Sequence, residues 1–344
     1  MYLEHYRLAK EPFHIASTPG FFYMGENHRE ALAMMVYGVR KRLGFVALVG
    51  DVGTGKTTVL RAYLEHIRGS DIRTILMFNP NVTFEGLLLH ILGGLGIDAS
   101  GRDERWMLHA LAYCLQQELN EGRTVALVID EAHHLPLATL EKMHLISNLE
   151  TGQGKLLQVV FLAQPELDDI IQDDRLRQIR QRIAVRYYLR PLRYWESRAY
   201  LRFRIQRAGG DPDYVFTRSA IKALARSAKG VPRLLNIFAD NALITGMGHG
   251  MRPVTPKVVR EVVRDFSPRR RFHFWRWAAA AALVIVAGTA LAAFAGATLS
   301  PNVVDSPDGT SIGARAPQPV ARVYSTRDSA ASATSSEDST ETIP

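Results

Sequence analysis

The chain has 344 residues, of which 47% are hydrophobic and 22% are charged, and it contains one cysteine. This composition is typical of globular domains, and it excludes a fold held by internal disulfides because a single thiol has no partner in the chain. The net charge of +8 is uneven: residues 300–344 hold six acids and three arginines, so the remainder carries +11. Such a surplus suits a phosphate-rich ligand, a nucleic acid or an anionic membrane, and it does not choose among them.

Residues 1–42 are predicted to be a lead-in that ends in a helix. Up to residue 25 the segment is rich in aromatic residues and interrupted by prolines. Between residues 26 and 42 the apolar residues recur at helical spacing. We therefore expect a helix that runs directly into the next element.

A phosphate-binding loop follows. Residues 45–49 are a continuous apolar run, which predicts a strand buried on both faces of a parallel sheet. The next eight residues read GDVGTGKT and match G-x-x-x-x-G-K-[ST] at every fixed position, with helix-forming sequence after them. The residues expected to bind the phosphates of ATP are Gly50, Asp51, Val52, Gly53, Thr54, Gly55, Lys56, Thr57 and Thr58.

The chemistry of a bound polyphosphate explains these residue types. Glycines let the backbone N–H groups turn inward around the phosphates, and the start of the helix adds partial positive charge. Lys56 is expected to reach the β and γ phosphates, while the Thr57 hydroxyl is placed to ligate Mg²⁺. The aromatic residues of the lead-in are predicted to pack against this nucleotide domain, with the edge of an adenine pocket as the alternative.

Further apolar runs predict the rest of the sheet. They lie at residues 73–78, 124–129, 156–163 and 185–189, with amphipathic stretches at 84–92 and 104–119. Strands that alternate with helices over residues 43–191 predict an α/β fold, a P-loop NTPase whose parallel sheet is flanked by helices.

Asp130 and Glu131 stand directly after the run 124–129. Carboxylates at the C-terminal tip of a parallel strand face the crevice in which α/β sheets bind ligands. We expect Asp130 to hold Mg²⁺ through water and Glu131 to polarise the water that attacks the γ phosphate. The adjacent His133 and His134 are predicted not to form a metal site, because neighbouring side chains on a helix do not face together.

Gln164 stands at the tip of the run 156–163, where it either senses the γ phosphate or caps a turn. Residues 173–183 then predict a helix dense in arginine, with Arg175, Arg177, Arg180 and Arg182. Such a helix is either a solvated surface or the source of an arginine finger that reaches the ATP of a neighbouring subunit.

Residues 192–267 are helical in pattern throughout, which predicts an all-helical lid domain. Arg233 lies just inside one helix start, where a nucleotide-sensing arginine is expected.

The composition changes after this domain. Arginines at 269–271 precede 23 residues, 277–299, that carry no charge. A helix of that length spans about 34 Å, enough for a bilayer core, so a transmembrane helix is predicted, with a surface or partner-packing helix as the alternative. The arginines place residues 1–270 in the cytoplasm, and the Ser-, Thr- and Pro-containing tail at 300–344 is predicted to be disordered on the other side.

Several stretches, in order, resemble one known family. They are MYLEHYRLAKEPFHIASTPGFFYMGENHREAL, GFVALVGDVGTGKTT, LVIDEAHHL, FLAQPEL, RQIRQRIAVRYYLRPL and GVPRLLN. Over residues 1 to about 267 the chain is similar to general secretion pathway protein A, the ExeA-type AAA+ ATPases. The resemblance implies an AAA+ module that forms a homo-oligomer, with the ATP site at the boundary between subunits.

The resemblance also implies residue roles and a location. By position, Lys56 and Thr57 are the Walker A pair, and Asp130 and Glu131 are the Walker B pair. Gln164 matches the first sensor and Arg233 the second, and Arg182 is the arginine finger that acts in trans. It implies a single span in the bacterial inner membrane and a periplasmic tail. The secretion members continue into a periplasmic peptidoglycan-binding domain, and the 45 residues of the tail are too few and too polar to supply such a folded site.

Three functions remain open at this point. The first is a membrane-anchored ATPase that binds and hydrolyses MgATP to drive assembly or energising of an envelope secretion or export machine. The second is a DNA-binding regulatory ATPase of the transposition or replication-initiation type, favoured by the +11 charge but disfavoured by the predicted span, so nucleic acid is not the expected partner. The third is a nucleotide-gated scaffold with very slow turnover.

Overall fold

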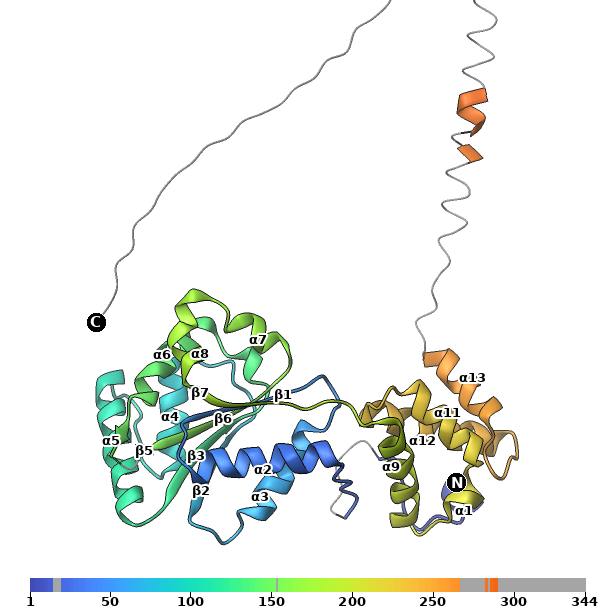
Figure 1. Ribbon diagram of the computed structural model, residues 1–344, viewed down its shortest axis with the longest axis horizontal. Coiled ribbons are helices and arrows are strands. Elements are labelled where there is room, and N and C mark those ends of the chain that lie inside the picture. Colours follow the sequence, from blue (N-terminus) through green and yellow to red (C-terminus); the bar gives the residue numbers. More distant parts are fainter. Residues whose placement is uncertain (15–19, 153, 267–281, 284, 290–344) are drawn as a thin grey trace, which may run out of the picture. The chain divides into compact units, whose positions relative to one another are not determined.

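A computed structural model describes residues 1–14, 20–152, 154–266, 282–283 and 285–289 (Figure 1). The chain divides into two units, Met1–Arg269 and Arg270–Pro344. In the second unit residues 282–283 and 285–289 are helical and exposed, and the rest of the predicted span and the tail lie outside the described residues. Within the part of the chain that is described, no helix has the length and apolar character needed to cross a membrane.

A five-stranded parallel sheet forms the centre of the first unit. Its strands are β1 (Phe45–Val49), β2 (Ile72–Met77), β3 (Thr124–Ile129), β6 (Leu157–Ala163) and β7 (Ile183–Tyr188), in the order β2-β3-β6-β1-β7. All residues of the three inner strands are buried, because helices cover both faces of the sheet. The five predicted strands are therefore confirmed, with ends that shift by one or two residues.

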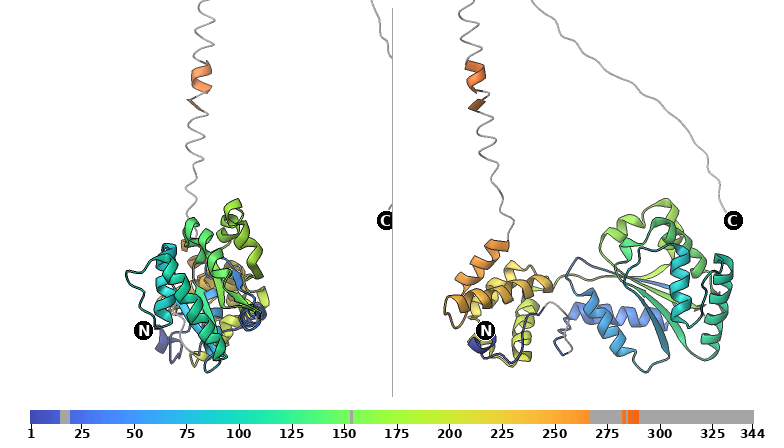
Figure 2. Two further views of the ribbon diagram at one scale, coloured as in Figure 1. Left: turned by 90° about the vertical axis from the view of Figure 1, so that its left-hand side faces the viewer. Right: turned by 180° about the vertical axis from the view of Figure 1, so that it is seen from behind.

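Alternate residues of each strand face the two halves of the core. Phe45 and Ala47 of β1 pack on one side with α4 (Phe84–Gly94), α5 (Glu104–Asn120) and α6 (Leu137–Ser147). Val46 and Leu48 pack on the other side with α2 (Glu26–Arg40) and α3 (Lys56–His66). Figures 1 and 2 show α2 and α3 across the sheet from α5.

A helix and a short hairpin between β3 and β6 were not predicted. Helix α6 begins after Pro136 and ends at Ser147, and a short hairpin, β4 (Glu150–Thr151) and β5 (Gly154–Lys155), follows it. The arginine-dense segment after β6 is also more broken than predicted. It consists of α7 (Glu166–Ile170), a 3₁₀ turn η2 (Asp174–Leu176) and the short α8 (Arg177–Arg182), which ends where Ile183 becomes extended.

The predicted lid is confirmed as a helical bundle with its own core. Its helices are α9 (Tyr194–Arg207), α10 (Pro212–Val215), α11 (Arg218–Ser227), α12 (Pro232–Gly248) and α13 (Pro256–Phe266).

The lead-in packs against this bundle, so the prediction that its aromatics pack against the nucleotide domain is wrong. Tyr6 and Phe13 are fully buried in the core of the bundle, beyond the short α1 (Tyr2–His5). The buried guanidinium of Arg204 fixes the segment, because its Nε donates to the carbonyl of Pro12 at 2.6 Å. Burial of these rings in the core of the bundle removes apolar surface from water, and this favours the packing.

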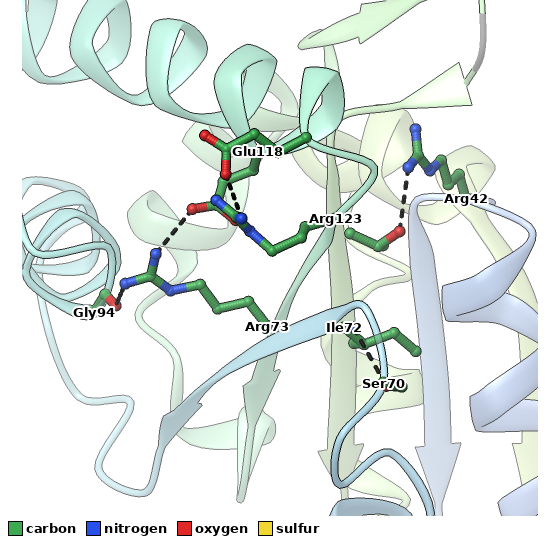
Figure 3. Close-up of polar contacts among 9 residues, drawn as sticks. Arg42, Ser70, Ile72, Arg73, Gly94, Glu118 and Arg123 are labelled. Carbon is green, nitrogen blue, oxygen red and sulfur yellow. Dashed lines mark hydrogen bonds and ion pairs between the residues drawn. The ribbon is translucent and has the colours of Figure 1, made fainter.

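A buried acid ties α5 to the edge of the sheet (Figure 3). The side chain of Glu118 is 9% exposed and forms ion pairs with Arg73 of β2 at 2.8 Å and with Arg123 at 2.6 Å. Arg73 also donates to the carbonyl of Gly94, at the end of α4, at 2.9 Å. The paired guanidinium groups hold the pKa of Glu118 below its ordinary value, so this carboxylate is charged at neutral pH.

Candidate functional site

The phosphate loop connects β1 to α3, and its shape depends on two glycines. Gly53 and Gly55 have φ of +79° and +110°, in the region that residues with a Cβ atom rarely adopt. A Cβ atom on Gly53 would lie 2.7 Å from Cβ of Arg233, and one on Gly55 would lie 2.5 Å from Nε2 of His28. The loop is therefore pressed between the lid and helix α2, and only glycine fits at these two positions.

His28 supports the loop from behind, and sequence reasoning missed it. Its ring is buried, and Nε2 donates to the carbonyl of Thr54 at 2.9 Å. Nδ1 has no hydrogen-bond partner among the described residues. Burial lowers the pKa of His28, so the ring is neutral at neutral pH. No local pattern marks this residue, since the contact exists only once α2 packs beside the loop.

Lys56 lies within the loop. Its Nζ donates to the carbonyl of Gly50 at 2.7 Å and to that of Asp51 at 3.3 Å. Burial lowers the pKa of Lys56, and the nearby carboxylates of Glu131 and Asp130 oppose the shift. The ammonium group is thus close to both predicted carboxylates, as the sequence predicts for a phosphate-binding lysine.

Asp130 and Glu131 follow β3 as predicted. Burial is the main cause that raises the pKa of Asp130, and its Oδ1 accepts the backbone N–H of Glu131 at 3.0 Å. Glu131 has φ of 52° and ψ of 42°, a left-handed conformation that is uncommon for a residue with a side chain. This turn ends the strand sharply and begins the 3₁₀ turn η1 (Ala132–His134).

Gln164 contacts Glu131 directly. Its Nε2 donates to Oε2 of Glu131 at 2.9 Å and lies 3.0 Å from Nε2 of His133. The prediction that Gln164 stands at the tip of β6 is confirmed. Its amide orients the predicted catalytic carboxylate, and it is not among the described residues that line the pocket below.

The two histidines differ from the prediction. The rings of His133 and His134 lie 4.1 Å apart between centroids, and one ligand atom from each lies within 4.8 Å of the other and of a Glu131 oxygen. The expectation that adjacent rings diverge is wrong because it assumed an α-helix, whereas these residues form a 3₁₀ turn that starts from a left-handed residue.

A pocket of about 430 Å³ joins the loop to the lid and the lead-in. Its lining includes the phosphate loop, with Lys56 and Thr57, and Glu131. Aromatic and lid side chains also line it: Phe21, Phe22, Tyr23, Leu192, Tyr200, Arg204 and Asn236. The alternative prediction, that aromatics of the lead-in edge a pocket for the base, therefore fits residues 21–23.

The two predicted arginines have different surroundings. Arg233 lies at the start of α12 and lines the pocket, and its backbone N–H donates to the carbonyl of Gly53 at 3.4 Å. Arg182 is bound within its own chain, where it donates to the carbonyl of Ser147 at 3.0 Å and to its hydroxyl at 2.7 Å. The structure brings Arg233 to the site and does not bring Arg182 there, so a role of Arg182 in a neighbouring subunit stays a prediction.

The residues of the pocket fit ATP with Mg²⁺. The loop, Lys56 and the start of α3 suit the phosphates. The exposed Thr57 hydroxyl in the pocket lining, and the carboxylate of Asp130, which precedes the lining residue Glu131, are oxygen ligands of the kind that Mg²⁺ prefers. Mg²⁺ would neutralise charge on the phosphates. The carboxylate of Glu131, held by Gln164, is the group predicted to polarise a water molecule.

The fold and the site define a P-loop protein of the AAA type. Residues 39–171 match the family model described as "AAA domain". The fold is also similar to two solved structures. Cdc6p from Pyrobaculum aerophilum is 17% identical, with a TM-score of 0.56, and the match covers 72% of this chain and 69% of that one. The ORC2 protein of Aeropyrum pernix is also 17% identical, with a TM-score of 0.55, and the match covers 74% of this chain and 71% of that one.

The predicted resemblance is confirmed by a curated relative, so the chain is an AAA ATPase related to general secretion pathway protein A. It is 36% identical to "General secretion pathway protein A" of Aeromonas hydrophila over 295 residues. The match covers 85% of this chain and 53% of the relative, so the chain spans about half the length of that protein.

Proposed function

We propose that the chain is a membrane-anchored ATPase that binds and hydrolyses MgATP to help build or energise an envelope secretion or export machine. The observation that carries the proposal is the convergence of the loop, Lys56, Glu131 and Arg233 on one pocket of about 430 Å³. A pocket that only stored nucleotide would not need a carboxylate oriented by a second residue, as Gln164 orients Glu131.

The proposed mechanism uses residues of this chain at three positions. The loop and Lys56 hold the phosphates, Glu131 accepts a proton from the attacking water, and Arg233 contacts the nucleotide from the lid. Because Arg233 lies on α12 and contacts the loop at Gly53, a change in nucleotide state would be transmitted to the lid. ATP bound between subunits would then hold an oligomer closed, and hydrolysis would loosen it.

The membrane and secretion parts of the proposal rest on the sequence and on the relative's name. The uncharged run 277–299 follows the arginines at 269–271, which favours an ATPase on the cytoplasmic side of a bacterial inner membrane and a tail in the periplasm. Membrane fractionation of the full chain, compared with a chain that carries two arginines within this run, tests the anchor. Wild-type protein that stays in the soluble fraction would refute it.

Hydrolysis and assembly are tested together. The rate of ATP hydrolysis per subunit is measured against the concentration of the full chain in detergent, beside Lys56→Ala and Glu131→Gln. A rate that rises with concentration and is lost in both variants supports a site completed between subunits. ATP binding with a flat, negligible rate would instead indicate a nucleotide-gated scaffold.

A DNA-binding regulatory ATPase is the second candidate, and the specific observation in its favour is the +11 charge of residues 1–299. Three of the four clustered arginines already have partners: Arg175 pairs with Asp173 at 2.8 Å, Arg180 contacts Gln172 at 3.0 Å, and Arg182 is bound to Ser147. Drosophila ORC, another fold neighbour, was solved bound to DNA, but at 15% identity it shares only the fold. Duplex binding that weakens steeply with salt would favour this candidate.

A further inference from the structure

The turn after β3 holds three side chains whose metal-binding atoms converge. One ligand atom each from Glu131, His133 and His134 lie within 4.8 Å of one another. The closest pair already has the spacing of a metal site, because Nε2 of His133 lies 3.4 Å from Oε2 of Glu131. Two ligands of one tetrahedral zinc ion, each bound at about 2.0–2.1 Å, lie roughly 3.3 Å apart.

The side chain of Gln164 bridges two of the three candidate ligands. Its Nε2 lies 2.9 Å from Oε2 of Glu131 and 3.0 Å from Nε2 of His133, and its backbone N–H donates to Nδ1 of His133 at 3.4 Å. A metal ion bound by both the carboxylate and the imidazole would displace this amide.

His134 is the third candidate ligand, and because it is exposed a metal ion can reach the site from solvent. Its ring stacks beside that of His133 at 4.1 Å between centroids. One of its ring nitrogens already lies within 4.8 Å of the other two ligand atoms. The backbone of the turn is fixed by the bond from the N–H of His134 to the carbonyl of Glu131 at 2.9 Å, and the turn starts from the left-handed Glu131.

We propose that Glu131, His133 and His134 form a binding site for a transition-metal ion of the zinc type, and that a metal ion bound there withdraws Glu131 from the hydrolytic site. Two imidazoles and one carboxylate are a donor set that zinc prefers, whereas Mg²⁺ prefers oxygen ligands alone. The site is thus distinct from the Mg²⁺ position at Thr57 and Asp130. A bound zinc ion occupies the carboxylate that would accept a proton from water, so it inhibits hydrolysis; this inhibitory part rests on the proposed function.

The binding step is tested without any measurement of activity. The full chain in detergent is stripped of metal and titrated with Co²⁺, whose visible absorption reports four-coordinate binding, and with Zn²⁺ by calorimetry. We expect one ion per chain, and we expect the Zn²⁺ affinity to fall by about 100-fold in His133→Ala and in His134→Ala. Removal of a residue that only holds a metal ligand in place already costs about 10–100-fold in affinity, and removal of the ligand itself should cost at least as much. His109→Ala, at an exposed histidine of α5, is the matched control and should bind as wild type does.

The inhibitory step uses the same variants. Hydrolysis is measured at saturating MgATP with free Zn²⁺ fixed by a metal buffer, and each rate is divided by the zinc-free rate of the same variant. We expect zinc to inhibit wild type and His109→Ala but not His134→Ala. Because His134 is exposed, its replacement leaves the fold intact, which the thermal unfolding of the variant verifies.

Two outcomes would overturn the proposal. Absence of saturable metal binding, or binding that His134→Ala leaves unchanged, contradicts the site itself. Binding without inhibition of an active enzyme contradicts the regulatory part. A chain that binds Zn²⁺ through these residues but hydrolyses no ATP would refute the proposed function and, with it, the inhibitory part, while the metal site stands.

Discussion

The contact between Gln164 and Glu131 leads to a quantitative prediction. The change is Gln164→Met, which keeps the size of the side chain and removes its N–H donors. It removes one hydrogen bond of 2.9 Å to an ionised carboxylate, a bond worth about 1.5–3 kcal/mol in general. Because the Glu131 side chain is 40% exposed, we take the lower end, about 1.5 kcal/mol. That energy corresponds to roughly a tenfold fall in kcat.

The structure also predicts what this change leaves intact. Gln164 does not line the pocket among the described residues, so the Kd for ATP should stay within about twofold of wild type. The assays are single-turnover hydrolysis for the chemical step and equilibrium binding of a labelled nucleotide for affinity. An arginine or lysine in the pocket would not give this pattern, because its loss would weaken binding.

A double-mutant cycle, measured on the residual single-turnover rate of Glu131→Gln, provides the control. If Gln164 acts through the carboxylate, Gln164→Met should cost less than about twofold once that carboxylate is replaced. A tenfold loss in both backgrounds would mean that Gln164 acts on the nucleotide itself, as a sensor of the γ phosphate. A loss below about twofold in wild type would show that the contact does not contribute to catalysis.

Three further predictions concern pH, the arginine helix and the α5 network. Burial lowers the pKa of His28 in the folded chain, so as pH falls the unfolded chain takes up a proton on this ring before the folded chain does. The free energy of unfolding should therefore fall as pH drops below about 6.5, and His28→Gln should flatten this dependence when it is measured by urea unfolding. Arg177 is exposed on α8, so Arg177→Ala should lower the concentration-dependent ATPase rate, whereas Arg182→Ala should mainly lower the melting temperature by removing its bonds to Ser147. Glu118→Gln should cost about 1–2 kcal/mol in denaturant unfolding because the acid is buried, against less than about 0.5 kcal/mol for the exposed Glu121→Gln; equal losses would refute the role of burial.

The sheet could be predicted because its strands carry their signal locally. Strands β1, β3 and β6 read as apolar runs since both of their faces are buried, and the loop after β1 has a fixed spacing. The position of Asp130 followed from the end of β3. Helix α6 also carried a signal, in buried residues at 140, 143 and 146, but its short, mixed sequence did not stand out from the surrounding loops.

The parts that were missed depend on tertiary contacts. Helical spacing places His28 on the same face of α2 as Ala31 and Met35, but it does not identify the neighbour of that face. Only the packing of α2 beside the loop brings His28 to the carbonyl of Thr54. The docking of Tyr6 and Phe13 on the lid could not be chosen from the sequence, since an aromatic segment packs on any apolar surface it can reach. Periodicity describes which face of an element is buried and does not identify the element that covers it.

The left-handed turn at Glu131 connects the unpredicted features of the site. A residue with a side chain pays for φ of 52° in backbone strain, of order 1–3 kcal/mol, so this conformation persists only where the surroundings impose it. Here it is compatible with two contacts, the bond from its N–H to Asp130 and the bond from Gln164 to its carboxylate. Replacement by glycine would relieve the strain but remove the carboxylate. The strain is therefore linked to the geometry of the site: the turn that begins at Glu131 also brings His133 and His134 beside it, and the proposed control of Glu131 by a metal ion rests on this arrangement.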